Sequence, residues 1–137
     1  MATPSCVLCR IAARELPVDP ILETDHVIGF LTSVEALALG HCVFFPKRHV
    51  PNLHEVDDTS LSEILLLVKK IAAAMGIETY NVLQNNGALA GQTVFHAHVH
   101  LIPKRSEAEG LRWERGSRRI DQTEIARRLK AALADSC

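Results

Sequence analysis

The sequence predicts an α+β fold: a five-stranded antiparallel sheet with one main helix and a helix near each terminus. Three observations support this prediction. The chain has 137 residues, of which 47% are hydrophobic, and this suits a single packed domain over residues 1–137. Apolar residues follow helical spacing in some segments and strand spacing in others, in the order helix, strands, helix, strands, helix. The connections between strands are of hairpin length, which favours antiparallel pairing.

The N-terminal third is expected to contain a short helix followed by strands. Residues 6–15 place apolar side chains on one helical face, and Pro17 ends this helix. Asp25 and His26 form a turn between two short strands. The next strand is continuously apolar and stops at Pro46, which indicates a central place in the sheet. These three strands are expected at residues 21–23, 27–31 and 42–45.

The main helix is expected to begin with a capping box formed by Ser60 and Glu63. Apolar residues then recur at helical spacing up to Met75, and Gly76 is a suitable C-terminal stop. A loop rich in turn-forming residues separates the last two strands. These strands are expected at residues 80–84 and 93–102.

The C-terminal part is expected to be irregular at residues 104–119 and helical at about residues 121–134. This helix is amphipathic, with basic residues on one face and an apolar face directed at the core. The apolar face consists of Ile125, Leu129 and Leu133.

Composition excludes several classes of function. The net charge of −1, with histidines neutral, provides no global positive field to hold nucleic acid or an anionic membrane. No stretch approaches the roughly 20 apolar residues of a membrane span. Residues 1–5 lack a basic region followed by an apolar run, so no secretory signal is expected and a cytoplasmic location is predicted.

Thiols stay reduced in the cytoplasm, so metal binding is a better use for Cys6 and Cys9 than a disulfide. No organic cofactor is expected.

Three histidines, His96, His98 and His100, alternate in the last predicted strand. Because successive side chains of a strand point to opposite faces, the three would share one face, spaced about 6.6 Å apart. Imidazole has an ordinary pKa of about 6.5. One ring nitrogen can therefore attack phosphorus at neutral pH while the other is fixed by a hydrogen bond. A solvent-facing polar strand, or a metal site that uses paired histidines, is the alternative.

Residues 91–103, Gly-Gln-Thr-Val-Phe-His-Ala-His-Val-His-Leu-Ile-Pro, resemble the signature of the histidine triad family. Residues 40–49, Gly-His-Cys-Val-Phe-Phe-Pro-Lys-Arg-His, resemble a second strand motif of that family. The Cys-x-x-Cys at residues 6–9 and the Glu-Leu-Pro at residues 15–17 also fit. The resemblance covers residues 6 to about 113, the expected core of the domain, and leaves the C-terminal helix outside.

The resemblance implies a purine-nucleotide-binding hydrolase that cleaves adenosine phosphoramidates or adenylylated amines, which are AMP derivatives. The third histidine is retained where the related transferases carry glutamine, so hydrolysis is favoured over nucleotidyl transfer. In family terms His98 is the nucleophile that forms a covalent nucleotidyl-histidine, and His100 contacts the phosphate and the bridging atom. His41 matches a supporting histidine, and a satisfied core histidine is the alternative. The resemblance also implies a homodimer in which the sheets of two copies join.

Phosphate and ribose contacts are implied for a loop that contains Asn85, Gly91, Gln92 and Thr93. Gln92 and Thr93 match residues that meet the phosphate through backbone N–H and hydroxyl groups. Asn85 could instead serve the turn, and Thr93 the strand. The family's acidic ribose-binding residue is absent after the second strand. Thr32 or Ser33 can hydrogen-bond a ribose hydroxyl there, without the added strength of a charge.

A structural zinc site is expected around Cys6 and Cys9. A Cys-x-x-Cys pair supplies half of a tetrahedral site, and two buried structural cysteines are the alternative. In the family members that carry this pair, the matching ligands are His49 and His96. A closed site with four protein ligands leaves no open position for water, so His96 would be structural and not catalytic.

Three functions stay open at this point. The first is a nucleoside phosphoramidase-like hydrolase, and the second is a dinucleoside polyphosphate hydrolase. Residues 104–113 look closer to the phosphoramidase branch. The third is a nucleotide-binding regulatory or scaffold protein whose activity is incidental. Trp113 either reaches toward a site, such as that of a partner copy, or covers a local core.

Overall fold

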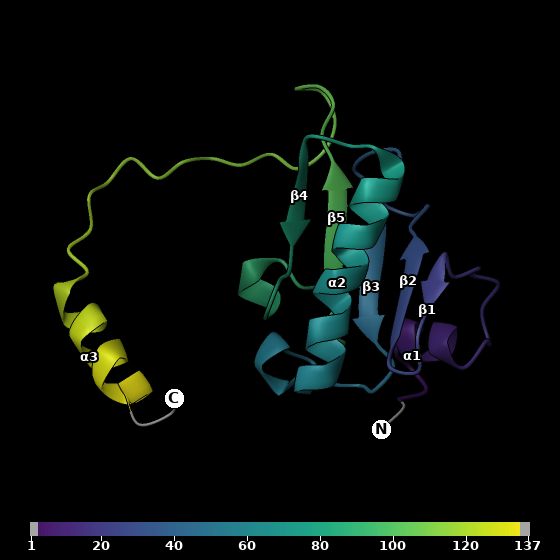
Figure 1. Cartoon of the computed structure of the whole chain (residues 1–137), viewed down its shortest axis with the longest axis horizontal. Helices are drawn as coiled ribbons and strands as arrows, with labels where there is room; N and C mark the ends of the chain where they lie inside the picture. The colour runs from purple at the N-terminus through teal and green to yellow at the C-terminus, as the bar shows by residue number, and fades with distance from the viewer. Residues whose placement is uncertain (1–2, 135–137) are drawn as a thin grey trace.

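Five antiparallel strands form one open sheet in the order β1-β2-β3-β5-β4, which confirms the predicted α+β class (Figure 1). The computed structural model describes residues 3–134. The strands are β1 (Leu22–Glu23), β2 (Val27–Leu31), β3 (Cys42–Pro46), β4 (Tyr80–Leu83) and β5 (Val99–Pro103). The helices are α1 (Val7–Ala12), α2 (Asp58–Met75) and α3 (Thr123–Ala134), and two short 3-10 turns are η1 (Leu53–Glu55) and η2 (Ala88–Ala90). The apolar strand β3 is central, as its sequence predicted.

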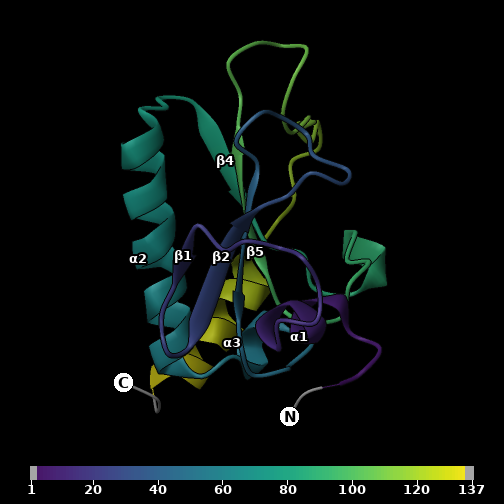
Figure 2. The same cartoon turned by 90° about the vertical axis from the view of Figure 1, so that its right-hand side faces the viewer.

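A helix covers each side of the sheet, with α2 on one side and α1 on the other (Figure 2). The strand β3 divides its side chains between them. Cys42 and Phe44 pack in the cluster under α2, whereas Val43 and Phe45 pack with α1. Gly29 lies against the Phe44 ring, where an added Cβ would be 2.9 Å from two ring carbons. Because Gly29 has no side chain, the Phe44 ring can pack directly against its backbone.

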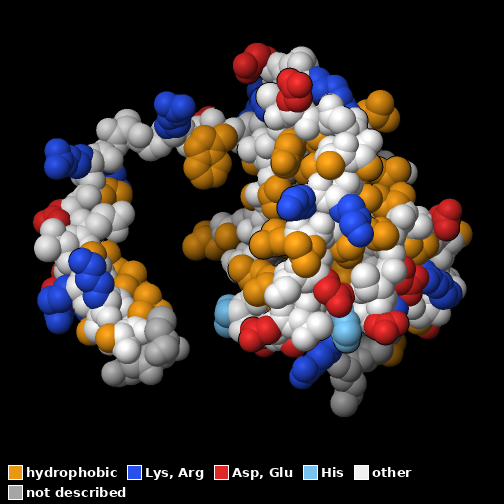
Figure 3. Space-filling view, in the orientation of Figure 1, with side chains coloured by type: hydrophobic (Ala, Val, Ile, Leu, Met, Phe, Trp, Pro, Cys, Tyr) orange, Lys and Arg blue, Asp and Glu red, His pale blue; other side chains and the backbone are white. Residues whose placement is uncertain are grey.

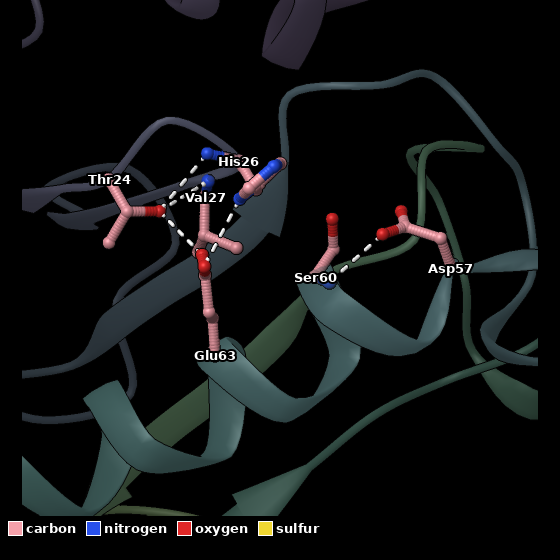
Figure 4. Close-up of polar contacts among 6 residues, drawn as sticks. All are labelled: Thr24, His26, Val27, Asp57, Ser60 and Glu63. Carbon is pink, nitrogen blue, oxygen red and sulfur yellow. Dashed lines mark hydrogen bonds and ion pairs between the residues drawn. The ribbon is translucent and has the colours of Figure 1, made fainter.

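The helix α2 begins one turn earlier than the sequence predicted (Figure 4). Its N-cap is Asp57, whose carboxylate accepts a hydrogen bond from the Ser60 backbone N–H at 3.0 Å. The predicted capping box of Ser60 and Glu63 is therefore wrong. Glu63 instead accepts hydrogen bonds from the Thr24 hydroxyl at 2.7 Å and from His26 Nδ1 at 3.1 Å, tying the β1–β2 turn to α2. The predicted stop is confirmed, because Gly76 has a φ of 65° at the C-cap.

The last strand is shorter than predicted, since β5 begins at Val99 and residues 94–96 form a bend. The preceding segment pairs with a loop and not with the sheet. The Ala97 N–H donates to the Val50 carbonyl at 2.7 Å, and the Gln92 side chain donates to the Pro51 carbonyl at 2.8 Å. The prediction of a strand over residues 93–98 is wrong for this reason.

The C-terminal helix is present as α3, but it stands away from the sheet at the end of an extended segment (Figure 1). None of the residues of α3 is buried. Ile125 is 42% exposed and Leu129 is 53% exposed, so the prediction that this face packs on the core of its own chain is wrong. Trp113, in the extended segment, is also exposed. No helix within residues 3–134 has both the length and the apolar character needed to cross a membrane.

Candidate active site and metal cluster

The ring of His98 is held in one orientation by a backbone carbonyl. Its Nδ1 lies 2.7 Å from the carbonyl oxygen of His96. A carbonyl can only accept, so Nδ1 carries the hydrogen and donates it. The other ring nitrogen, Nε2, is then left with its lone pair. His98 is partly buried and not enclosed, so this lone pair belongs to an orientated nucleophile at the edge of the domain.

His100 has the opposite hydrogen-bonding pattern, which His41 fixes. The Leu37 backbone N–H donates to His41 Nδ1 at 3.1 Å, so the hydrogen of the neutral His41 ring is on Nε2. That nitrogen lies 2.9 Å from His100 Nδ1 and donates to it. The hydrogen of the neutral His100 ring must then be on Nε2. Burial lowers the pKa of His41 and lowers that of His100 to about 4, so both rings are neutral at pH 7.

His98 and His100 therefore present a lone pair and an N–H donor side by side. Their ring centroids are 4.9 Å apart. His100 is paired with Val43 in β3 and with Leu83 in β4, which places it on the α1 side of the sheet. His96 and His98 precede β5, so the strand spacing predicted for the three histidines does not apply to them.

His96 belongs to a different cluster, with Cys6, Cys9 and His49. One potential ligand atom from each of the four residues lies within 4.8 Å of the others. His96 Nδ1 is 3.4 Å from Cys6 Sγ, and His49 Nδ1 is 3.3 Å from Cys9 Sγ. The two histidine Nδ1 atoms are 3.2 Å apart. The four residues are therefore a group that could hold one metal ion.

The environment of this cluster suits metal ligation. Cys6 is the N-cap of α1, and the helix places Cys9 one turn later on the same side. His96 Nε2 donates to the Pro46 carbonyl at 2.7 Å, which leaves Nδ1 with its lone pair facing the thiols. Burial lowers the pKa of His96 to about 4 and raises the pKa of the Cys6 thiol. A neutral imidazole is thus available, while a bound cation would stabilise the thiolate that burial disfavours.

The glycine-rich loop before the triad is held by its own side chains. Gln92 is buried, and its amide accepts from the Gly87 N–H at 2.7 Å, while its backbone N–H donates to the Gly87 carbonyl. Gly91 has a φ of 95°, and a Cβ there would lie 3.3 Å from the Asn85 amide nitrogen. Thr93 is exposed. Gln92 therefore stabilises the loop in this conformation. The nucleotide contacts expected for Asn85, Gly91, Gln92 and Thr93 stay a prediction.

The loop between β2 and β3 lies next to the histidine relay, the chain of hydrogen bonds from the Leu37 N–H through His41 to His100. The Thr32 backbone N–H donates to the His41 carbonyl at 3.0 Å, and the Thr32 hydroxyl donates to the Val34 carbonyl. Thr32 and Ser33 line a shallow hollow that is mostly apolar. Its lining residues are Leu31, Thr32, Ser33, Ala36, Leu37, Ala38, Leu39 and Gly40. A ribose contact by Thr32 or Ser33 stays a prediction.

Comparison with known proteins identifies the family of this chain. Residues 13–107 match the HIT domain. The chain belongs to the HIT domain family. The resemblance drawn from the triad segment is therefore confirmed. As a HIT domain, the chain is 43% identical over 107 residues to an adenosine 5'-monophosphoramidase of Saccharomyces cerevisiae, covering 78% of this chain and 67% of that protein. It is 44% identical to the protein of the same name in Schizosaccharomyces pombe, covering 78% and 80%.

Solved structures confirm the fold. The crystal structure of a histidine triad nucleotide-binding protein from Candida albicans is 37% identical, with a TM-score of 0.87. The match covers 97% of this chain and 100% of that chain. A Leishmania major protein matches with the same TM-score at 34% identity, covering 98% of this chain and 99% of that chain.

Two contributors to this HIT domain site escaped sequence reasoning because they are backbone groups. The His96 carbonyl orients His98, and the Leu37 N–H orients His41. Every residue carries such groups, so no residue type marks them. For His41 a signal did exist in the Gly-His pair at residues 40–41. Its role became visible only once its contact with His100, 59 residues away, was known.

Proposed function

We propose that this protein is a nucleoside phosphoramidase-type hydrolase that breaks the bond from the α-phosphorus of a purine nucleotide to its leaving group. The observation that carries the proposal is the pairing of a free Nε2 lone pair on His98 with an Nε2–H donor on His100. Relatives more than 40% identical are named adenosine 5'-monophosphoramidases, which supports an adenosine phosphoramidate or adenylylated amine as substrate.

The reaction proceeds in two displacements. His98 Nε2 attacks the α-phosphorus as the phosphorus–nitrogen bond breaks, and the leaving amine takes up one proton. The His100 N–H donates to a phosphate oxygen or the bridging atom, stabilising charge that develops there. Water then attacks the nucleotidyl-histidine, the bond from phosphorus to Nε2 breaks, and the water releases one proton. The protons balance, and His98 returns to its neutral form.

Trapping of the covalent intermediate tests this function. The protein is mixed with an adenosine phosphoramidate labelled at phosphorus, quenched and mapped by peptide analysis. We expect label on His98, and we expect His98→Ala to lower kcat on the order of 1000-fold or more. The matched control is His54→Ala, because His54 is an exposed histidine in η1. Turnover by His98→Ala at the unaltered rate would remove the nucleophile assignment.

Two rival functions predict different results. A dinucleoside polyphosphate hydrolase would turn over a diadenosine polyphosphate with a higher kcat/KM than the phosphoramidate. A regulatory or scaffold protein would keep its cellular role in the His98→Ala variant while losing hydrolysis. Residues 104–113 and the names of the relatives favour the phosphoramidase.

Zinc is the metal that we propose for the Cys6, Cys9, His49 and His96 cluster. A tetrahedral zinc ion with its usual bond lengths separates two nitrogen ligands by about 3.3 Å, and a nitrogen and a sulfur by about 3.6 Å. The corresponding contacts are 3.2 Å between the histidines and 3.3–3.6 Å between histidine and cysteine. The two thiols and two imidazoles are also the donor set that zinc prefers.

Metal analysis of protein purified without added zinc tests this assignment. We expect one zinc per chain, with Cys6 and Cys9 protected from a thiol reagent until a chelator is added. Cys42 is the internal control, since its buried thiol lies outside the cluster and burial raises its pKa to about 11. Substoichiometric zinc with reactive Cys6 and Cys9 would contradict the proposal. Zinc binding needs Cys6 and Cys9 in the reduced form, and thiols stay reduced in the cytoplasm. We therefore also propose a cytoplasmic location.

A homodimer that continues the sheet is the assembly that we propose. The strand β4 is an edge strand, and Val82 is 47% exposed although it is paired with Leu101 on the α2 side. On α2 itself, Leu65 and Leu66 are also exposed. Figure 3 shows hydrophobic side chains gathered on this side of the molecule, over α2. A second copy placed edge to edge with β4 would cover this surface and leave no open edge there.

The C-terminal segment supports the same assembly. Residues 111–134 carry seven Arg or Lys and three Asp or Glu, a net charge of +4, whereas residues 1–110 have a net charge of −4. The segment is thus complementary in charge to the domain of a second copy. The match to the Candida albicans structure covers 97% of this chain, so it extends into this segment.

The dimer is tested by the molar mass in solution. We expect light scattering after size exclusion to give twice the 15.1 kDa chain mass. Leu66→Glu, on the exposed face of α2, is expected to shift it to one chain mass. Ile21→Glu is the matched control, because Ile21 is exposed beside β1 at the other edge of the sheet. A single chain mass for the unaltered protein at all concentrations would overturn the dimer.

A further inference from the structure

The carbonyl that orients the nucleophile lies in a segment outside the backbone hydrogen-bond ladder of the sheet. The pairing of β3 with β5 begins at Phe44 and Val99, so His96 and His98 precede the ladder. Residues 94–96 form a bend. The direction of the His96 carbonyl is therefore not set by strand pairing, as it would be in the regular strand that the sequence predicted.

The side chain of His96 holds this segment in place. The side chain is fully buried. Its Nε2 donates to the Pro46 carbonyl at 2.7 Å, and its Nδ1 lies 3.2–3.6 Å from Cys6, Cys9 and His49. The next residue adds one backbone hydrogen bond, from the Ala97 N–H to Val50. The same residue thus enters the four-ligand cluster with its ring and accepts the His98 hydrogen bond with its carbonyl.

We propose that the cluster of Cys6, Cys9, His49 and His96 is a positioning element for the nucleophile, acting through the His96 carbonyl on His98. This inference rests on the proposed function, which assigns His98 as nucleophile. A filled cluster holds the His96 ring from two sides and so fixes its backbone. An incomplete cluster leaves the ring with the Pro46 hydrogen bond and the edge contact with the Phe45 ring. These two contacts do not fix the ring from the side of the ligands, and the carbonyl can move away from His98 Nδ1.

The consequence for the reaction is specific. Once His98 Nδ1 loses its acceptor, the ring hydrogen distributes between both nitrogens and the ring turns. Fewer molecules then present the Nε2 lone pair to phosphorus. The hollow lined by Thr32 and Ser33 lies on the β2–β3 loop, and within residues 3–134 no hydrogen bond joins either side chain to the cluster. We therefore expect the rate of attack to fall with little change in substrate affinity.

The variant Cys9→Ser tests the inference, with Cys42→Ser as its matched control. Cys9 is preferred to Cys6 because the Cys6 side chain also caps α1. Cys42 is a second buried cysteine, and it lies in the core under α2 outside the cluster. The readouts are zinc content, kcat and KM for an adenosine phosphoramidate, and the nitrogen-15 spectrum of the histidine rings. That spectrum distinguishes an Nδ1–H ring from an Nε2–H ring, and His98→Ala identifies the His98 signals.

For Cys9→Ser we expect loss of zinc, an unchanged KM, a kcat lower by roughly 10- to 100-fold, and loss of the single Nδ1–H form of His98. For Cys42→Ser we expect all four readouts to match the unaltered protein. Cys9→His restores a four-ligand set and is expected to recover zinc, kcat and the Nδ1–H form together. Loss of zinc with His98 still in the Nδ1–H form and kcat unchanged would overturn the inference.

A merely structural cluster gives another result, which graded metal removal from the unaltered protein reveals. If the cluster only supports the fold, kcat falls in step with the far-ultraviolet circular dichroism, and the inference is overturned. If it positions His98, kcat falls in proportion to zinc while the circular dichroism and KM hold. Failure of the proposed function is recognised separately, because His98→Ala would then retain turnover in the zinc-loaded protein.

Discussion

The two nitrogens of His41 have different partners, so two substitutions can separate their effects. Asn at position 41 keeps an acceptor near the place of Nδ1, where the Leu37 N–H donates, and loses the donor to His100. Gln keeps a donor near the place of Nε2 and loses the acceptor for Leu37. His41 is only 4% exposed, so water does not readily replace either partner.

The magnitudes follow from these two hydrogen bonds. In His41→Asn, His100 Nδ1 loses its donor and the N–H that faces substrate is no longer fixed. A loss of about 1–3 kcal/mol at the transition state lowers kcat by roughly 5- to 150-fold. The free energy of unfolding should also fall by on the order of 1 kcal/mol, because the part-buried His100 Nδ1 is left without its donor. In His41→Gln, the part-buried Leu37 N–H is left unpaired, which costs on the order of 1 kcal/mol of stability, while kcat stays within about 3-fold.

Steady-state hydrolysis of an adenosine phosphoramidate and urea unfolding measure the two effects on the same preparations. The expected result is a similar loss of stability in both variants, with a large fall in kcat in His41→Asn alone. If kcat falls equally in the two variants, His41 acts only by filling space. The donor chain from Leu37 through His41 to His100 would then be refuted.

Three further predictions concern stability. Burial holds the pKa of His100 at about 4, below its ordinary value of 6.5, so the unfolded chain binds the proton first as pH falls. His100 alone should lower the free energy of unfolding by on the order of 3 kcal/mol between about pH 6.5 and pH 4, and His96, whose pKa burial also lowers to about 4, acts in the same direction. A flat urea series over this range would contradict the burial of His100. Asp57→Ala should cost about 1 kcal/mol through the lost bond to the Ser60 N–H, whereas Asp57→Ser should not; equal unfolding midpoints would exclude Asp57 as the cap. Gly29→Ala should cost about 1–3 kcal/mol by displacing the Phe44 ring, and an unchanged melting temperature would show that the ring moves freely.

Local patterns predicted the elements well, because helices and strands are periodic. The strand β3, the helix α2 and the C-cap Gly76 all lie where apolar spacing and glycine placed them. The errors arose where a long-range contact overrides a local signal. Ser60 has good capping chemistry, but Asp57 occupies the cap and Glu63 bonds to the β1–β2 turn. Apolar spacing in α3 predicted a face without specifying which chain would cover it.

The candidate site divides in the same way. The residue types of the metal cluster were expected from the family resemblance, and the four residues do converge. The strand alternation that predicted three histidines on one face applies only from Val99 onward. The relay from His41 to His100 joins segments that are far apart in the chain, and no local pattern encodes such a contact.

The three histidines within five residues differ in role because a different ring nitrogen of each is occupied. His96 donates from Nε2 to the Pro46 carbonyl, so Nδ1 is left for a metal. His98 donates from Nδ1 to the His96 carbonyl, so Nε2 is left for phosphorus. His100 accepts at Nδ1 from His41, so its Nε2–H is left for a phosphate oxygen. The residue type supplies an imidazole each time, and the fold decides which of ligand, nucleophile or donor it becomes. Removing the hydrogen-bond partner of one of these histidines should therefore change which ring nitrogen is free, and with it the role of that histidine, although the histidine itself is unaltered.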